Sequence, residues 1–321
     1  NGVKRIALVV PIAADRNEII GSWRARGKAE EAISILDALS GEVQVIYAPG
    51  CDFDGDDRSG FREAVNAARD ADLVVCCLGE RASWSGESAS RSDIALPSVQ
   101  AELLAAVAAT GKPVVTVLSS GRPLDVRNIY PYSKAVLQIW QPGTMGGYAV
   151  ADVLSGRVNP SAKLPVTMPR SVGQIPVYYN RRNPARGGDM GRYQDISSEP
   201  MHYFGYGLSY STFEYSELSR EGNTISVKVT NTSAVDGKET VLWYIRDVAS
   251  NITRPGRELK FFEKRLIKAG ESEVFSFEIE PERDLVYLDE DGNSVLEDGK
   301  FLIWASSGLG DCEALEYNYK K

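Results

Sequence analysis

Histidine is almost absent from this chain, which has a single one, His202, among 321 residues. A zinc site built on paired histidines is therefore excluded, and one candidate remains for any Ser-His or Cys-His pair. Basic charge is also in deficit, with 36 Lys and Arg against 44 Asp and Glu. The net charge of −8 and the pI near 5.0 argue against a nucleic-acid partner and an anionic membrane, because both need a positive face.

Cysteines and long apolar runs are scarce as well. Cys76 and Cys77 lie within an apolar run and no CxxC spacing occurs, so we expect small buried side chains and no redox pair. Cys51 and Cys312 lie in different halves, and a bridge between them stays open. No apolar run approaches the roughly 20 residues that span a bilayer. The chain starts at Asn1 without an initiator methionine or a signal-like segment, which suggests a processed product or a fragment.

The first half of the chain, residues 1–165, alternates strand and helix patterns. Short unbroken apolar runs of this kind are typical of strands buried on both faces of a parallel sheet. The runs cover residues 6–10, 43–47, 73–78, 114–118 and 135–139, and helical spacing recurs over 29–39, 61–68, 99–109 and 145–154. The alternation predicts an α/β domain with an open, doubly wound, mostly parallel sheet.

Two further parts follow this domain. Residues 166–211 are rich in proline and glycine and lack periodicity, which predicts an irregular linker arm, and their aromatic side chains indicate that the arm packs on something. Residues 212–321 carry short alternating strands separated by turn signals such as Asp236-Gly237. This pattern predicts an all-β sandwich of the immunoglobulin or fibronectin-III type.

Ligands of open α/β sheets bind beyond the carboxyl ends of the strands. Trp23 follows the first predicted strand there, and Glu80 and Trp84 follow the third. Aromatic rings and polar side chains at one edge fit a sugar better than a phosphate. A phosphate-binding loop and a GxSxG motif are absent, residues 205–210 only begin like a dinucleotide fingerprint, and the acidic turn 52–57 lacks the spacing of a calcium loop. The sequence therefore predicts no cofactor and no metal.

An ordered series of motifs runs through the whole chain. It comprises residues 79–97, Gly121-Arg122-Pro123, 159–165, 171–176, 204–210, and Arg254-Pro255 with Glu258-Leu259. Together these motifs resemble family-3 glycoside hydrolases, in particular the bacterial β-glucosidase branch, over essentially the entire chain. The family combines an N-terminal (β/α)8 barrel, an α/β sandwich and a fibronectin-type-III-like domain, and this sequence resembles only the last two.

The resemblance implies a divided active site. The family's nucleophile is an aspartate on the barrel, which has no counterpart here, and its general acid/base is a glutamate on a loop of the α/β sandwich. By motif position that glutamate is Glu87, with Arg91 matching the family's arginine. Where the commonest motif has glycine and aspartate, this chain has Ser88 and Ser90. Retaining hydrolysis needs two carboxyl groups about 5–5.5 Å apart, so half a site is what such a chain would carry.

Each candidate residue has an alternative role. Glu87 could be an ordinary exposed loop acid, and Trp23, which matches an aromatic flanking the outer sugar subsite, could be a core tryptophan. Trp84 is a candidate wall of a subsite. Glu80 is expected to orient the loop, and His202 is expected to pack.

We therefore expect the C-terminal portion of a retaining β-glucosidase that acts on terminal β-D-glucosyl residues of a β-glucoside or oligosaccharide and is inactive without its barrel. A β-xylosidase or broad exo-β-glycosidase would share this half. The rival from another class is a non-catalytic carbohydrate-binding or assembly module, and a nucleotide-binding or receiver domain is disfavoured by the absent phosphate loop. Periplasmic or secreted location is expected from the resemblance, cytoplasmic location stays open, and the sequence is compatible with a homo-oligomer.

Overall fold

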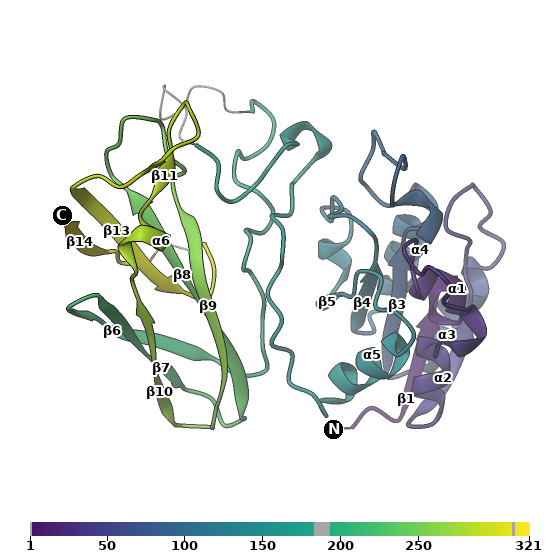
Figure 1. The fold of residues 1–321 in the computed structure, drawn as a ribbon. Coiled ribbons are helices and arrows are strands. Elements are labelled where there is room, and N and C mark those ends of the chain that lie inside the picture. The colour runs from purple at the N-terminus through teal and green to yellow at the C-terminus, as the bar shows by residue number, and fades with distance from the viewer. Residues whose placement is uncertain (1, 183–192, 310–311) are drawn as a thin grey trace. The chain divides into compact units, whose positions relative to one another are not determined.

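The computed structural model describes residues 2–182, 193–309 and 312–321, which form two compact units (Figure 1). The first unit comprises Asn1–Val158 and Pro169–Ile175, and the second comprises Asn159–Met168 and Pro176–Lys321. The chain therefore changes unit three times between Val158 and Pro176. The predicted arm, 166–211, is shared between the units in this division, and its residues 183–192 lie outside the described ones. The boundaries 1–165, 166–211 and 212–321 remain a prediction about domains.

A five-stranded sheet lies at the centre of the first unit, with all neighbouring strands parallel and the order β2-β1-β3-β4-β5. The predicted class of an α/β domain with an open parallel sheet is confirmed. The strands are β1 (Arg5–Val9), β2 (Gln44–Ala48), β3 (Leu73–Gly79), β4 (Val114–Ser119) and β5 (Ala135–Gln138). The helices are α1 (Arg16–Ile19), α2 (Ile35–Ser40), α3 (Phe61–Asp70), α4 (Ser98–Ala108) and α5 (Gly146–Ser155).

The helix expected over residues 29–39 is divided in the structure. A single 3₁₀ turn covers Ala29–Glu31, and α2 begins only at Ile35. Ser34 is the reason, because its hydroxyl accepts a hydrogen bond from the Asp37 backbone N–H while the Asp37 carboxylate accepts one from the Ser34 backbone. This capping box satisfies the first N–H groups of α2 and fixes its start.

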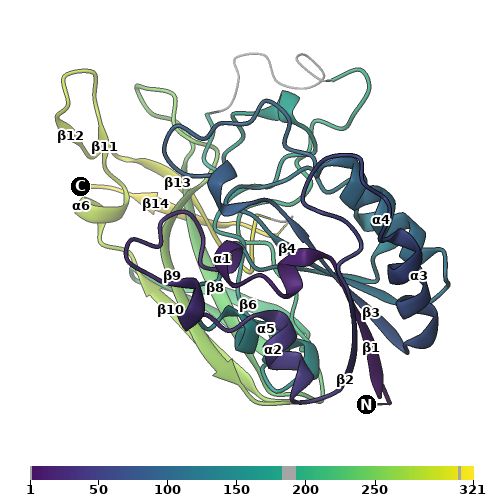
Figure 2. The same ribbon diagram turned by 90° about the vertical axis from the view of Figure 1, so that its right-hand side faces the viewer.

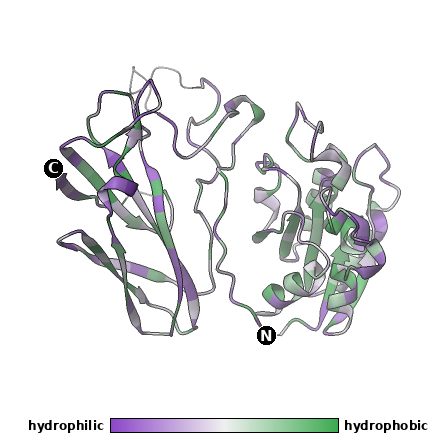
Figure 3. Cartoon of the chain, viewed as in Figure 1, coloured by the Kyte–Doolittle hydropathy of each residue, from purple (hydrophilic) through white to green (hydrophobic). Residues whose placement is uncertain are grey.

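Helices cover both faces of the parallel sheet. Figure 2 shows α2 and α5 on one side and α3 and α4 on the other. Hydropathy follows this arrangement, with apolar residues concentrated on the strands (Figure 3). Cys76 and Cys77 on β3 are fully buried, which confirms that they act as small core side chains, and all four cysteine thiols, each within the described residues, are free.

The strand order locates the position where a ligand would bind. From β1 the chain moves to one side of the sheet to form β2, and from β2 it crosses to the other side to form β3. Loops that leave the carboxyl ends of β1 and β3 therefore diverge, and the crevice between them is the topological switch point of the sheet.

Two antiparallel sheets form the sandwich of the second unit, with orders β10-β7-β6 and β14-β13-β8-β9. The predicted fibronectin-III-like sandwich is confirmed. Its strands are β6 (Phe213–Glu221), β7 (Thr224–Asn231), β8 (Gly237–Asp247), β9 (Glu258–Ile267), β10 (Ser272–Glu278), β13 (Gly299–Ser306) and β14 (Leu315–Tyr319). The hairpin β11 (Tyr287–Leu288) with β12 (Ser294–Val295) and the short α6 (Pro281–Asp284) complete the unit.

The glycine-rich motif at 204–210 belongs to the packing of this second unit. The Leu164 N–H donates to the Tyr206 carbonyl at 2.7 Å, and the Gly205 N–H donates to the Leu164 carbonyl at 2.9 Å. A Cβ at Gly207 would lie 2.3 Å from the Ala162 carbonyl oxygen, so glycine is needed for this close approach. His202 stacks on Tyr206 with ring centroids 4.0 Å apart, in keeping with the packing role expected for it.

Candidate active site

The loop that follows β3 carries the predicted acid/base residue. Its regular structure is limited to one 3₁₀ turn, Ala82–Trp84, and Glu87 is exposed to solvent near its tip. The tip is a tight turn in which the Ala89 N–H donates to the Gly86 carbonyl at 3.3 Å. Because so few ladder or helix hydrogen bonds hold this loop, its shape depends on side chains that reach it from elsewhere.

Glu80, the first residue after β3, is a buried charge at the base of this loop. Its side chain is 2% exposed, and its two carboxylate oxygens lie 3.1 Å from Nε of Arg122 and 3.3 Å from Nε of Arg91. Burial raises the pKa of Glu80, although both arginines act in the opposite direction. The position of Glu80 fits the loop-orienting role expected from the sequence.

Gln141, which follows β5, connects the loops after β1 and β3. Its side-chain oxygen accepts a hydrogen bond from the Ser22 N–H at 3.3 Å, and its side-chain nitrogen donates to Oγ of Ser85 at 3.0 Å. The sequence analysis gave no role to Gln141 or to Arg122. The available signal was their position, since each lies three residues after the end of a strand, at the carboxyl edge where the candidate site was expected.

Trp23 lies at this edge and is exposed. The residue is 73% accessible, so a core tryptophan at this position is ruled out. Its indole nitrogen would lie 3.6 Å from a Cβ built on Gly86, the residue before Glu87. The structure thus brings the aromatic residue after β1 next to the turn that carries the candidate acid/base.

Trp84 is in a different environment. It is half-buried and packs against the core of the first unit, and the Arg91 guanidinium lies 4.6 Å above its ring. Because Arg91 covers one face of the Trp84 ring and the core lies against it, Trp84 has less ring surface available for a sugar than Trp23 has. The role of Trp84 as a subsite wall stays a prediction.

Backbone strain gathers at the same edge of the sheet. Val10 after β1, Ser88 after Glu87 and Trp140 after β5 have φ of 84°, 61° and 54°. Residues with side chains seldom adopt such angles, and they persist where the surrounding structure enforces them, often at functional sites. The angle at Ser88 also explains why glycine is common after the glutamate in the motif that the sequence resembles, because glycine adopts positive φ without strain.

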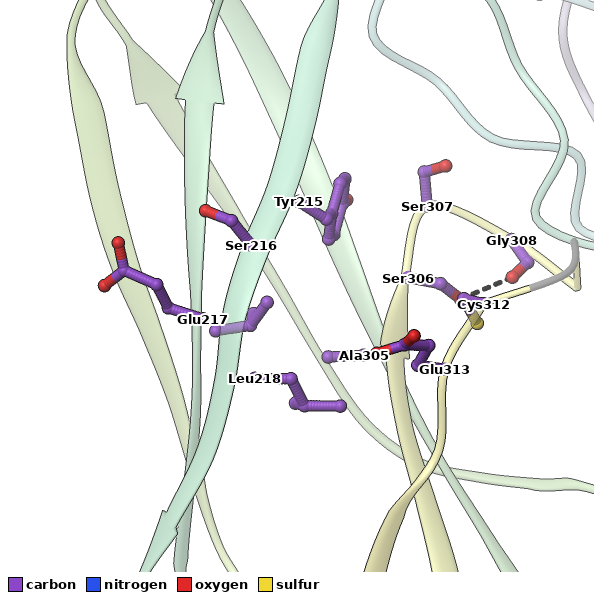
Figure 4. Close-up of a pocket in the computed structure, with 11 residues that line it drawn as sticks. Tyr215, Ser216, Glu217, Leu218, Ala305, Ser306, Ser307, Gly308, Cys312 and Glu313 are labelled. Atoms are coloured by element: carbon purple, nitrogen blue, oxygen red, sulfur yellow. Dashed lines mark hydrogen bonds between the residues drawn. The ribbon is translucent and has the colours of Figure 1, made fainter.

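An open cavity of about 450 Å³ lies in the second unit and shares no residue with this loop (Figure 4). Its lining includes Tyr215 and Glu217 of β6 and, opposite them, Cys312 and Glu313. Figure 4 shows the Glu217 carboxylate directed away from Glu313, so the two acids do not converge. Glu217 pairs with Lys228 at 2.8 Å and lies at a bulge of β6, which accounts for its φ of 54°.

Over the described ranges no group of three or more His, Cys, Asp or Glu side chains is placed to hold a metal ion. In that same part of the chain, no helix has the length and apolar character needed to span a bilayer. The candidate site consists of the exposed Glu87 carboxyl group and the exposed Trp23 indole ring, with Glu80 buried against Arg122 and Arg91 at the base of the loop. A carboxyl group can transfer a proton, and an exposed aromatic ring can stack on a sugar.

Two protein-family models match parts of this chain. Residues 1–210 match the glycosyl hydrolase family 3 C-terminal domain, and residues 239–308 match the fibronectin type III-like domain. A periplasmic beta-glucosidase of Salmonella typhimurium is 37% identical over 93% of this chain and 44% of its own length. A beta-xylosidase of Formosa agariphila is 37% identical over 99% of this chain and 46% of its own.

Solved structures give the same picture. A beta-glucosidase from Listeria innocua, crystallised in complex with isofagomine, superposes with a TM-score of 0.91 at 35% sequence identity. The match covers 98% of this chain and 46% of the Listeria protein, so the chain spans less than half the length of the relatives described here. The chain belongs to glycosyl hydrolase family 3 and corresponds to the C-terminal part of its members, namely their α/β domain followed by a fibronectin type III-like domain.

Proposed function

We propose that this chain supplies the general acid/base of a retaining β-glucosidase and that Glu87 is that residue. The exposed position of Glu87 on the turn beside Trp23, at the switch point of the sheet, is the observation that carries the proposal. A carboxyl group in this place is free to approach a substrate held by another domain.

The proposed reaction divides the two carboxyl groups between domains. Glu87 protonates the glycosidic oxygen as the leaving group departs, while an aspartate on a (β/α)8 barrel outside this chain attacks the anomeric carbon. Glu87 then acts as a base on the water that releases the sugar from the covalent intermediate. Trp23 offers a ring face on which the outer part of the substrate stacks. This chain alone is expected to be inactive, because it lacks the nucleophile.

We propose a terminal β-D-glucosyl group as the sugar, in keeping with the beta-glucosidases among the relatives. A β-xylosidase or a broader exo-β-glycosidase is the alternative, and the Formosa relative supports it. The barrel would make many of the contacts that distinguish one sugar from another. A periplasmic or secreted location is proposed on the same basis, from the periplasmic relative.

Glu87→Ala, made in the enzyme formed by this chain and its barrel domain, tests the assignment. We expect kcat on aryl β-glucosides to fall by about 10²- to 10⁴-fold, the usual contribution of general acid/base catalysis. Azide should restore part of the turnover of activated substrates, because it attacks the intermediate without help from a base. Glu217→Ala is the matched control, since Glu217 is an exposed glutamate of the second unit. Activity that survives Glu87→Ala, or the lack of any azide effect, would refute the role of Glu87.

The rival function is a non-catalytic carbohydrate-binding module, and the exposed ring of Trp23 is the observation in its favour. Calorimetry with glucose or cellobiose on the isolated chain separates the two proposals. A half-site that is open on one side should bind weakly, because most of the sugar surface stays in water. Low-micromolar binding that Trp23→Ala abolishes would support the module instead.

A further inference from the structure

Arg122, in the segment directly after β4, contacts the acid/base loop at three points. Its Nε lies 3.1 Å from Oε2 of Glu80. Its Nη2 donates to the Trp84 carbonyl and also to the Ala89 carbonyl, the latter at 2.9 Å. The side chain is only 18% exposed, so these interactions lie in a largely desolvated place, where hydrogen bonds from a charged donor are strong.

The two carbonyls stand on either side of Glu87. Trp84 ends the 3₁₀ turn before it, and Ala89 closes the tight turn after it. One guanidinium therefore fixes the separation of the two chain segments from which the Glu87 turn projects. A planar guanidinium with several N–H donors suits this task, whereas an ammonium group is a single point charge.

Glu80 in turn holds Arg122 in place. Its carboxylate is nearly inaccessible, and the second oxygen faces Arg91, whose guanidinium stacks on Trp84. Arg122, Glu80, Arg91 and the ring of Trp84 thus form a cluster at the base of the turn that carries Glu87. A buried carboxylate with an arginine on each side leaves little freedom to the arginine that reaches up to the loop.

We propose that Arg122 is the positioning residue of the Glu87 loop: anchored on Glu80, it fixes the carbonyls of Trp84 and Ala89 and so places the Glu87 carboxyl for proton transfer. This inference rests on the proposed function for the role of Glu87. The hold of Arg122 on the two carbonyls, here called the clamp, can be measured without any substrate.

The first experiment measures amide hydrogen exchange on this chain as it is. Arg122→Lys keeps the positive charge beside Glu80 but loses the several N–H donors of the planar guanidinium. Amide exchange in residues 82–91 should therefore become about tenfold faster or more, the factor expected from losing a hydrogen bond to a charged group. Arg58→Lys is the matched control, because Arg58 makes a bidentate pair with Glu102 on the surface of the same unit. If a single substitution at Arg122 prevents folding, the double variant Arg122→Met with Glu80→Gln removes both buried charges and gives the same readout.

The second experiment measures kcat/KM in the enzyme that includes the barrel. Misplacing an acid slows substrates with poor leaving groups, which need protonation, more than substrates with dinitrophenyl leaving groups, which do not. We expect Arg122→Lys to lower kcat/KM about tenfold more for the poor leaving group, whereas general loss of folded enzyme would lower both equally.

The outcomes separate the clamp from the proposed function. Faster loop exchange together with the leaving-group effect supports the positioning role. Exchange in residues 82–91 that matches the Arg58→Lys control would overturn the clamp, whatever Glu87 does. Faster exchange in Arg122→Lys combined with full activity of Glu87→Ala would overturn the proposed function, and the positioning role with it.

Discussion

The parallel-sheet unit and the sandwich unit each bury a glutamate. Glu80 in the first has a side chain 2% exposed between Arg122 and Arg91, and Glu239 on β8 of the second has a side chain 3% exposed. Glu239 lies 3.1 Å from Nζ of Lys163 and accepts a hydrogen bond from the Tyr215 hydroxyl at 2.9 Å. Burial, with the nearby Glu239 carboxylate as a smaller contribution, raises the pKa of Tyr215, so this hydroxyl stays a donor.

The two clusters differ in what they hold. The partners of Glu239 are Tyr215 on β6 and Lys163 in the segment 159–168. These contacts therefore join parts of the framework within the second unit. Of the partners of Glu80, Arg122 also donates to the backbone carbonyls of Trp84 and Ala89, on either side of exposed Glu87. A buried glutamate paired with a cation therefore joins parts of the framework in the sandwich, whereas in the parallel-sheet unit it holds the loop that carries Glu87.

One tryptophan from each unit gives the largest expected difference between the framework of the sandwich and the exposed edge of the parallel-sheet unit. Trp243 on β8 is completely buried in the sandwich core, and its indole N–H has no acceptor among the described residues, so its contribution is apolar packing. We expect Trp243→Ala to lower the free energy of unfolding of the sandwich by about 3–5 kcal/mol, measured by urea denaturation. Trp23→Ala should change stability by less than about 0.5 kcal/mol and instead raise KM in the barrel-containing enzyme.

A large loss of stability in Trp23→Ala would contradict the assignment of this residue to the surface. Trp243→Phe is a useful control for the core position, because it keeps an aromatic ring and should cost less than the alanine variant.

Breaking the buried ion pair between Lys163 and Glu239 should have the next largest effect on stability. Lys163→Met leaves the Glu239 carboxylate buried without its cation, and we expect a loss of about 3 kcal/mol in the free energy of unfolding. Adding Glu239→Leu to Lys163→Met should recover part of that loss, since no unpaired charge then remains. Neither variant should alter hydrogen exchange in residues 82–91. A faster exchange there would show that the two clusters are not independent, which the comparison requires them to be.

Substitutions at Ser88 test the backbone conformation of the Glu87 turn, and we expect them to have the smallest effect on stability. Ser88→Gly removes the strain of a positive φ but adds freedom to the unfolded chain, so the free energy of unfolding should change by less than about 1 kcal/mol. Ser88→Val should lower it by about 1–3 kcal/mol, because a β-branched residue fits this backbone poorly. Thermal denaturation of both variants measures the difference. Equal stability of the two variants would argue that the turn does not keep φ of 61° in solution.

Much of the fold was predictable because its signals are local. The apolar runs at 73–78 and 114–118 became β3 and β4 with boundaries shifted by one residue. The break between Ala29–Glu31 and α2 was missed, since apolar spacing continued through Ser34 and concealed its capping box. The sequence also predicted a candidate site at the carboxyl edge of the sheet, because loops after parallel strands meet there, and the structure brings Trp23 next to the turn that carries Glu87.

The sequence by itself determined the five parallel strands, the two fold classes and the family to which the chain belongs, because apolar periodicity and an ordered series of motifs are local properties of the chain. The tertiary structure decided which side chains meet. Arg122 reaches Glu80 across 42 residues and Gln141 reaches Ser22 across 119, and such contacts depend on strand order and register. It also decided that Trp23 is exposed while Trp84 is half-buried beneath Arg91, because burial depends on what the rest of the chain places around a residue.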